Sequence, residues 1–288
     1  MPPRRAIATM VIAGATPPAF DPEVNELEGY ARPRRMLTVM SEPVSDLSLL
    51  RREAGLLWGA DRHGRHDRPP LVILADSGTE LWLNVSDQLA NAPPDRWRTA
   101  LMAGGPGAPP PGLRSIKEEL DHSTPSILTS CVSYLLDPVR QCAVPSGLTV
   151  HDSDRPVSAH LLHARPEQTW QPLEWQDLLE SRLGPWAMAI HDGEVVALCH
   201  TPRDSGHEAE AGVWTHPDHR GRGYAAVVVA RWAGIAARDR DALFYSHLDD
   251  NVASRSVAVK LRARPIGRIW QLHLGAQPVS SPISNSLS

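Results

Sequence analysis

The sequence is poor in lysine and cysteine and contains none of the most common hydrolase motifs. Only two of its 288 residues are lysine, Lys117 and Lys260, and neither follows a glycine, so the phosphate-binding loop G-x-x-x-x-G-K-[ST] is absent. The patterns G-x-S-x-G and H-E-x-x-H are also missing, which excludes the usual signatures of ester hydrolases and zinc proteases. The three cysteines are too widely spaced for a disulfide framework or a zinc site, and this favours a reducing, cytoplasmic location.

Long apolar runs and an excess of one charge are missing as well. No apolar stretch approaches the ~18 residues that a membrane-spanning helix requires, so we expect no membrane association. The net charge is −4 and is shared evenly between the two halves, so no basic surface for nucleic acid is expected. Residues 6–15 resemble a secretory signal peptide only loosely. With 42% hydrophobic residues, the chain can form a sizeable core in one large or two modest domains.

Glycine, proline and serine indicate where the chain divides. Residues 1–35 and the serine-rich residues 276–288 are predicted to be disordered tails. A Gly/Pro-rich loop over residues 103–112 interrupts an N-terminal region, residues 36–140, because this composition suits neither a helix nor a central strand. The elements expected in this region are helices at 47–58, 95–102 and 116–121, strands at 70–75 and 81–85, and an apolar stretch at 127–136.

Residues 141–275 show a clearer series of strands and helices. His191-Asp192-Gly193 separates two apolar runs and predicts a β-hairpin. Strands that precede a strand–helix–strand–helix–strand series imply an α/β (α+β) fold, in which helices flank a mixed, largely antiparallel sheet. The expected elements are helices at 173–183, 224–238 and 251–262, and strands at 186–190, 194–200, 208–215, 242–248 and 266–274.

The turn that precedes the helix at 224–238 has the features of an anion site. The first backbone N–H groups of a helix have no partner inside the helix, and they lie at the positive end of its dipole. Gly221 and Gly223 lack a Cβ, so an anion can come close to the main chain. Arg220 and Arg222 add forked donors that suit phosphate. The turn therefore indicates a pyrophosphate ligand, although an ordinary surface turn can have the same composition.

A dinucleotide-binding fold also competes for this turn. Gly221-x-Gly223-x-x-Ala226 fits the fingerprint G-x-G-x-x-[GA], but that fingerprint begins directly after a strand. Five residues separate Thr215 from Gly221, and the strands before the turn are expected to be antiparallel. Both observations disfavour a Rossmann fold.

A second pattern fits the turn better. The segment Arg220–Ala225 reads R-x-x-G-x-A and matches the signature [RQ]-x-x-G-x-[GA], so it resembles the pyrophosphate turn of the GCN5-related N-acetyltransferase (GNAT) superfamily. About thirty residues later, Asn251–Leu261 is similar to that family's N-x-x-[AS]-x-x-x-x-x-K-L segment. The resemblance covers roughly residues 141–275, and residues 1–140 match no family.

The resemblance implies acetyl-coenzyme A as the co-substrate and assigns residues to its parts. The sheet is expected to open between the strands at 208–215 and 242–248, which leaves room for the thioester and an incoming amine. The residues expected to bind the coenzyme are Arg220, Gly221, Arg222, Gly223, Tyr224 and Ala225 for the pyrophosphate, and Val213, Thr215, Asn251 and Ser254 for the pantetheine arm.

Direct transfer of an acetyl group to an amine needs a group that removes a proton from the amine. Glu210 is the first candidate, and Glu208 is the second. Both share one face of their predicted strand with Trp214, because side chains alternate along a strand. His200 and His207 are further candidates for the same role.

The transfer also needs a group that protonates the departing thiolate. Many members of the family carry a tyrosine seven residues after the asparagine, but here that position is Ala258. Tyr245 is therefore expected to donate the proton, with His247 or water as substitutes.

The sequence thus predicts an N-acetyltransferase that moves acetyl from acetyl-coenzyme A to the amine of a small molecule or peptide, with no metal, nucleic-acid or membrane partner. His63 and His66 have metal-like spacing but no further ligands nearby. The alternative is a coenzyme-A-binding sensor or structural module without turnover, which Ala258 leaves open. The N-terminal region would be a degenerate copy of the same fold, a lid over the acceptor groove, or the contact element of a homodimer.

Overall fold

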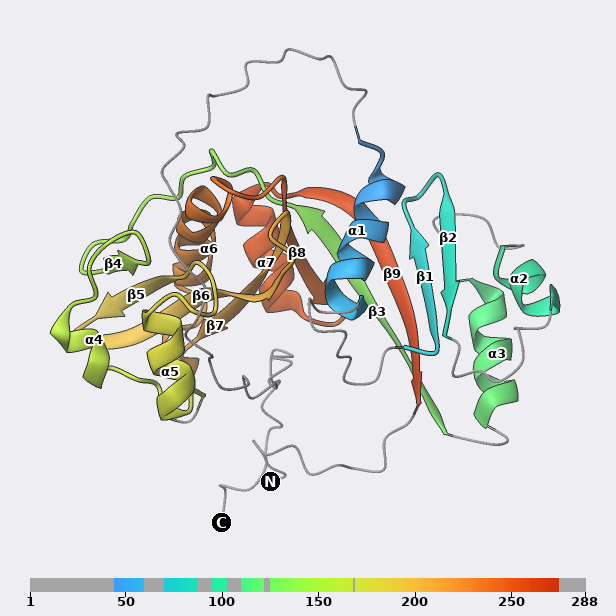
Figure 1. The fold of residues 1–288 in the computed structure, drawn as a ribbon, viewed down its shortest axis with the longest axis horizontal. Helices are drawn as coiled ribbons and strands as arrows, with labels where there is room; N and C mark the ends of the chain where they lie inside the picture. Colours follow the sequence, from blue (N-terminus) through green and yellow to red (C-terminus); the bar gives the residue numbers. More distant parts are fainter. Residues whose placement is uncertain are drawn as a thin grey trace, which may run out of the picture.

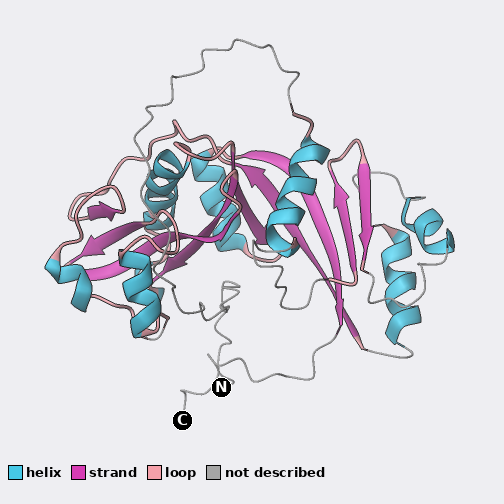
Figure 2. Ribbon diagram, viewed as in Figure 1, coloured by secondary structure: helices cyan, strands magenta, loops and turns pink. Residues whose placement is uncertain are grey.

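The computed structural model describes residues 44–59, 70–86, 95–102, 110–121, 125–167 and 169–274. Their strands form one mixed sheet with helices on both faces (Figures 1 and 2), which confirms the predicted α/β fold class. The predicted tails, residues 1–35 and 276–288, lie outside the described residues, as do residues 103–109 of the predicted loop. None of the described helices is long and apolar enough to cross a membrane.

The described sheet has nine strands in the order β2-β1-β9-β3-β8-β7-β6-β5-β4. Neighbouring strands are antiparallel, except for β7 and β8, which are parallel. The strands are β1 (Val72–Asp76), β2 (Leu81–Val85), β3 (Ser126–Leu135), β4 (Thr149–Asp152), β5 (Ala187–His191), β6 (Glu194–Asp204), β7 (Glu208–Thr215), β8 (Ala242–Leu248) and β9 (Arg264–Leu274).

Helices cover both faces of this sheet; they are α1 (Asp46–Trp58), α2 (Asp95–Met102), α3 (Pro111–Asp121), α4 (Ala159–His163), α5 (Pro172–Leu179), α6 (Tyr224–Ala236) and α7 (Val252–Leu261). Alternate residues of β8 show how the faces divide. Leu243 and Tyr245 pack into the core with α6 and α7, whereas Ala242 and Phe244 pack with α1. Helix α1 therefore lies on the face opposite to α6 and α7, as Figure 1 also shows.

Most predicted elements are confirmed, but two predicted helix boundaries are wrong. The helix predicted at 116–121 begins at Pro111, inside the predicted loop 103–112. Proline is well suited to the first helical position, because its φ is already helical and its missing N–H needs no partner there. Helix α5 is shorter than the helix predicted at 173–183, because the chain turns at Ser181 with a left-handed φ of 60°.

Strand β3 connects the two predicted regions. By sequence it belongs to the region 36–140, yet it lies between β8 and β9 and pairs antiparallel with both. Cys131 of β3, for example, lies opposite Leu248 on one side and Ile269 on the other. Residues of the regions 36–140 and 141–275 therefore share one continuous sheet.

Candidate active site

The sheet opens between β7 and β8, as the sequence predicts. The two strands pair in parallel only from Glu208, opposite Ala242, to Glu210, opposite Phe244. Beyond this point β7 continues to Thr215 in register with β6 alone. The other edge of β7 is therefore unpaired along its last residues within the described sheet.

The predicted anion turn follows directly from this open strand. After β7 the chain forms a short 3-10 helix, Pro217–His219, and then reaches α6 through Gly221 and Gly223. These two glycines have φ values of 77° and 86°, a left-handed conformation that other residues rarely adopt. A Cβ built on Gly221 would meet nothing within 4 Å, so the approach to this part of the main chain is open.

Unpaired donors and positive charge meet at the turn. Among the described residues, the backbone N–H groups of Gly221–Ala225 donate no hydrogen bond to the protein. The guanidinium groups of Arg220 and Arg222 donate hydrogen bonds to the backbone oxygens of Thr215 and Asp218, both just before the turn. The Nζ atom of Lys260, on α7, lies 3.5 Å from the Cβ position of Gly223. Five N–H groups, two arginines and a lysine fit a doubly charged phosphate group.

A group of histidines lies beside the same turn. The ring centroids of His191 and His216 lie 5.4 Å and 5.5 Å from that of His219, and Tyr224 lies next to His191 and His219. The pKa of His219 is lowered by loss of water contact and then by Arg222 and the two histidines. Sequence analysis missed this group because His191 comes from the distant β5–β6 hairpin.

The start of α7 brings three predicted site residues together. Asn251 caps the helix, since its Oδ1 accepts a hydrogen bond from the Ser254 N–H at 3.0 Å. The Tyr245 hydroxyl donates to the backbone oxygen of Ser254 at 3.2 Å. Burial raises the pKa of Tyr245, so its hydroxyl keeps its proton. Ala258, which replaces the usual tyrosine, is buried among the residues that pack α6 and α7 on the sheet.

Glu210 lies at the point where the two strands separate. Its side chain is 6% exposed, and Oε1 accepts hydrogen bonds from the N–H and the hydroxyl of Ser246 at 3.0 and 2.7 Å. The second oxygen, Oε2, is buried without a hydrogen-bond partner in the described structure. Burial raises the pKa of Glu210 to about 7, although the two bonds from Ser246 act to lower it. A carboxyl group of this kind can accept a proton near neutral pH.

Glu208 has a different environment on the same face of β7. Its Oε1 forms an ion pair with the Arg52 guanidinium of α1 at 2.7 Å, and its Oε2 accepts a hydrogen bond from the Ser205 hydroxyl. The carboxylate of Glu208 is therefore already bound to a cation. Glu208 therefore joins α1 to the start of β7.

Glu53 is a third acidic residue at this place, and sequence analysis missed it. It lies on the buried face of α1, with Leu49, Leu50 and Ala54, and its side chain is fully buried. Burial, and next the negative charge of Glu210, raise the pKa of Glu53 well above its ordinary value. The available signal was its helical spacing from Leu49 and Leu50, which places a carboxyl group on the apolar stripe.

The predicted histidines occupy separate environments. His200 is 6% exposed and packs against Gly212, and burial lowers its pKa to about 4, so the ring is neutral at pH 7. His207 is exposed and lies 3.6 Å from Asp241. The Nδ1 atom of His247 lies 2.8 Å from the backbone oxygen of Leu248.

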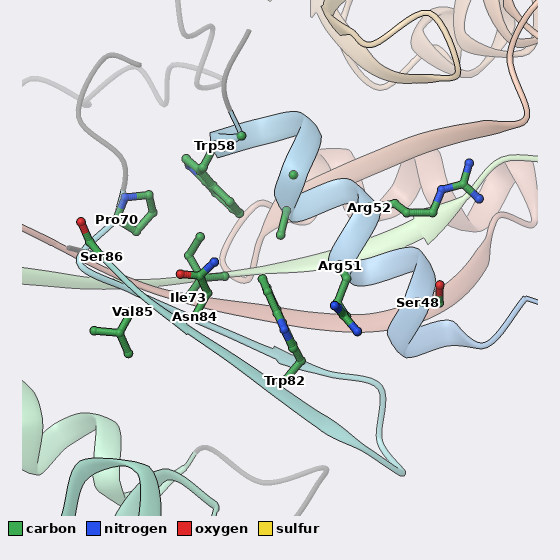
Figure 3. A pocket seen from close by; sticks show the side chains of 13 residues that line it. Ser48, Arg51, Arg52, Trp58, Pro70, Ile73, Trp82, Asn84, Val85 and Ser86 are labelled. Atoms are coloured by element: carbon green, nitrogen blue, oxygen red, sulfur yellow. The ribbon is translucent and has the colours of Figure 1, made fainter. Parts of the chain in front are cut away.

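A cavity of about 900 Å³ lies outside the opened sheet, between α1 and the β1–β2 hairpin (Figure 3). Trp58 and Trp82 line it, together with Arg51, whose guanidinium lies 5.4 Å from the Trp82 ring centroid.

No group of three or more His, Cys, Asp or Glu side chains in the described part of the chain could hold a metal ion. The predicted histidine pair at 63 and 66 lies outside that part.

Comparisons with known proteins identify the second half of the chain. The model of the acetyltransferase (GNAT) domain matches residues 146–264, and no curated protein sequence matches the chain. Similar solved structures include a Drosophila protein, with 15% sequence identity and a TM-score of 0.41. The match covers 57% of this chain and 58% of the Drosophila chain, which is less than two thirds of that protein's length. A GCN5-related N-acetyltransferase-like protein from Streptococcus suis has 15% identity and TM-score 0.42, over 72% of this chain and 84% of its own.

A third similar structure is an acetyltransferase of the GNAT family from Colwellia psychrerythraea, with 16% identity and TM-score 0.39, over 68% of this chain and 76% of its own. The family model covers both predicted motifs in full, the turn at Arg220–Ala225 and the segment Asn251–Leu261. Residues 146–264 therefore form a domain of the acetyltransferase (GNAT) family.

Proposed function

We propose that this chain is an N-acetyltransferase that moves the acetyl group of acetyl-coenzyme A directly to the amine of a small molecule or peptide. The observation that carries this proposal is the set of unpaired N–H groups of Gly221–Ala225, next to the strand edge that β8 leaves open. A pyrophosphate joined to an extended, amide-bearing arm suits both features, because anions bind at helix N-termini and extended chains bind at strand edges.

The expected contacts follow from the positions of the site residues. The main chain of Arg220–Ala225 would hold the pyrophosphate. The backbone of Val213 and Thr215 would pair with the pantetheine arm along the open edge of β7. Asn251 and Ser254 lie at the start of α7, across the opening, and would contact the same arm.

The proposed transfer uses two proton steps. Bound acetyl-coenzyme A supplies the acetyl thioester. The Glu210 carboxylate accepts a proton from the ammonium group of the acceptor, which frees the nitrogen lone pair for attack on the thioester carbonyl carbon. The bond from that carbon to sulfur then breaks, and the Tyr245 hydroxyl is the proposed proton source for the thiolate. The nitrogen loses its second proton as the amide forms, and that proton restores the phenol through water. Glu208 is less suited to the first step, because Arg52 already occupies its carboxylate.

A second candidate function is coenzyme A binding without turnover. The observation that favours it is Ala258, which is 1% exposed and has no hydroxyl to offer at the position where the family often has tyrosine. Both candidates are in keeping with the reducing cytoplasm, since the three thiols, Cys131, Cys142 and Cys199, are unpaired.

Binding is tested by isothermal titration with acetyl-coenzyme A on the native chain and on two alanine variants. Gly221 and Gly78 both have a positive φ and open space at the Cβ position, so either change to alanine should cost about 1 kcal/mol of stability. Only Gly221→Ala disturbs the turn, and we expect it to weaken binding roughly tenfold or more, which corresponds to one or two lost N–H contacts. Equal affinities of Gly221→Ala and Gly78→Ala would exclude this turn as the pyrophosphate site.

Turnover separates the two candidate functions. The native chain should release free coenzyme A in the presence of some members of a panel of amines, and Glu210→Gln should lower that rate by roughly 10²-fold or more while it still binds acetyl-coenzyme A. Tight binding with no release for any amine would instead support the module without turnover.

A further inference from the structure

Four polar side chains form a row beneath α1, on the face of the sheet away from α6. Side chains alternate along a strand, so Glu210 of β7 points to the opposite face from Ala209, which packs with α6. Ser246 of β8 bonds to Glu210 on that face. Ser133 of β3 lies opposite Ser246 in the ladder, and Glu53 on the buried side of α1 completes the row. The row crosses three strands at the point where β7 and β8 separate.

The row is buried with too few hydrogen bonds. Both oxygens of Glu53, the Oγ of Ser133 and the Oε2 of Glu210 have no hydrogen-bond partner within the described residues. Two ionised carboxylates in such a place would be strongly unfavourable, because each loses its water and each repels the other. At least one of the two carboxyl groups must therefore keep its proton at neutral pH.

The surrounding groups offer no compensating charge. Arg52, the nearest cation on α1, is turned toward Glu208, and no ion pair among the described residues includes Glu53 or Glu210. Burial raises the pKa values of the neighbouring thiols and phenol, so these groups are uncharged as well. Cys131 of β3 shares the face of the pair, and Gln271 of β9 donates a hydrogen bond to its Sγ. Cys199 of β6 and Tyr245 of β8 lie across the sheet, in the core with α6 and α7, and interact with Glu210 only through its charge.

The proton belongs on Glu53 rather than on Glu210. Glu53 is fully buried and has only the Ser133 hydroxyl beside it as a donor, whereas Glu210 has two hydrogen bonds from Ser246 that favour its ionised form. Both pKa values are raised, that of Glu53 well above its ordinary range and that of Glu210 to about 7. As pH rises, the first proton therefore leaves Glu210, and the second stays on Glu53.

We propose that Glu53 is a positioning residue of the active site: as a neutral carboxylic acid on α1, it donates a hydrogen bond toward Oε2 of Glu210 and keeps Glu210 in its proton-accepting form near neutral pH. This inference rests on the proposed function for its kinetic consequence. It gives the N-terminal region a part in the reaction, because the transferase domain defined by residues 146–264 does not contain α1.

The kinetic test compares Glu53→Gln, Glu53→Leu and Glu194→Gln. Glutamine at position 53 keeps a hydrogen-bond donor beside Glu210, whereas leucine at this position removes the donor. Glu194, an exposed glutamate at the β5–β6 hairpin, serves as the control. The acidic limb of the pH profile of kcat/KM should stay in place for Glu53→Gln and Glu194→Gln. For Glu53→Leu it should move up by about one pH unit, since a desolvated carboxylate without its donor holds a proton more tightly. The rate at pH 7 should then fall about fivefold, because the ionised fraction of Glu210 falls from about one half to about one tenth, and it should recover at higher pH.

Identical pH profiles for Glu53→Leu and the native chain would overturn the proposal. Such a result would mean that Glu53 only fills space and does not affect the titration of Glu210. A shifted limb for Glu53→Gln as well as for Glu53→Leu would also overturn it, because the donor would then be irrelevant. Titration with acetyl-coenzyme A confirms that each variant is folded and still binds.

A second measurement needs no activity. The infrared spectrum of the protein alone should show the carbonyl stretch of a protonated carboxylic acid at pH 8, present in Glu194→Gln and absent in Glu53→Gln. If the native chain lacks this band, the proposal fails whether or not the chain acetylates amines. If the band is present but no amine is acetylated, the protonated Glu53 is supported and the proposed reaction alone is overturned.

Discussion

Glu208 and Glu210 stand two residues apart on the same face of β7, and α1 gives them different chemistry. Arg52 forms an ion pair of 2.7 Å with Glu208, whereas Glu53, the next residue on the helix, places a second carboxyl group beside Glu210. Helix α1 therefore gives the two glutamates different partners. Of the two, Glu210 has the pKa that a proton acceptor needs at neutral pH.

The buried side chain of His200 should make the stability of the protein depend on pH. Its pKa is lowered from 6.5 to about 4 by burial, so the unfolded chain binds a proton on this ring between these two pH values and the folded protein does not. Stability should therefore fall as pH decreases from 6.5 to 4, by up to about 3 kcal/mol for this residue. Urea unfolding of the native chain and of His200→Gln, compared at each pH, should show that the variant lacks this decrease.

The comparison needs a control because other groups titrate in the same range. Glu210 has a raised pKa, so its contribution to stability is lost as pH rises, and it acts against that of His200 in the native chain. His207 is exposed, and His207→Gln should keep the native pH dependence. The free energies of unfolding of His200→Gln and of the native chain could instead differ by the same amount at every pH from 4 to 7. That result would show that His200 is protonated in the folded state.

The sequence places these side chains on faces but does not show their partners. Alternation along the strand correctly predicts that Glu208 and Glu210 share a face, since the period of a strand is fixed by its backbone. Their partners on α1 precede them by about 156 residues. Such a contact depends on how the helix crosses the sheet, and no local pattern encodes it. Glu53 was therefore beyond the reach of the motif that identified the turn at Arg220.

At the scale of elements, Gly267 allows β1 and β9 to approach each other closely. Its φ is 138°, and a Cβ at this position would lie 2.2 Å from the backbone oxygen of Asp76 and 2.8 Å from Leu50. Backbone atoms cannot move aside cheaply, so Gly267→Ala should lower the free energy of unfolding by about 3 kcal/mol or more. Thermal unfolding followed by circular dichroism measures this loss.

Gly234 is the matched control for that substitution. It lies in α6, is exposed, and a Cβ there would contact only the backbone oxygen of Pro138, at an ordinary 3.6 Å. Alanine has the higher helix propensity, so Gly234→Ala should stabilise the protein by about 0.5–1 kcal/mol. If both variants lost stability equally, the close approach of β1 and β9 would not explain the role of Gly267.

Elements with a strong local pattern are those that the sequence predicts well. The strands at 208–215 and 242–248 and the helix at 95–102 have the predicted bounds, because their apolar periodicity is clear and turn residues flank them. Strand β4 and helix α4, with four and five residues, were not predicted. Elements this short carry at most two periods of their apolar pattern, and their packing on longer neighbours stabilises them.

At the scale of the whole molecule, the order of the strands was beyond prediction. The sequence suggests a boundary near residue 140, and the family model begins at residue 146. The sheet nevertheless places β3 between β8 and β9, and β1 on the far side of β9. Both strands come from residues before this boundary, and pairing between distant segments leaves no local signal in either of them.

This arrangement predicts that the transferase domain cannot fold without the N-terminal region. In a fragment of residues 141–288, β9 would lose both of its neighbours, and β8 would lose β3. The apolar face of β8 and β9 around Phe244 and Ile269, now covered by α1, would be exposed to water. We expect the fragment to be insoluble or to lack a cooperative thermal transition, whereas the full chain should unfold in one transition because its sheet is continuous.

The complementary fragment distinguishes the missing strand from a general loss of chain. Coexpression of residues 1–140 with residues 141–288 should restore a soluble complex, because it returns β1 and β3 to β9 and also brings back α1. The same coexpression with Val132→Pro in the first fragment should fail, since Val132 lies in the middle of β3, opposite both His247 and Arg268, and proline disrupts a central strand. A monomeric, cooperatively folding fragment 141–288 would contradict this view and would mean that the transferase domain supplies its own complete sheet.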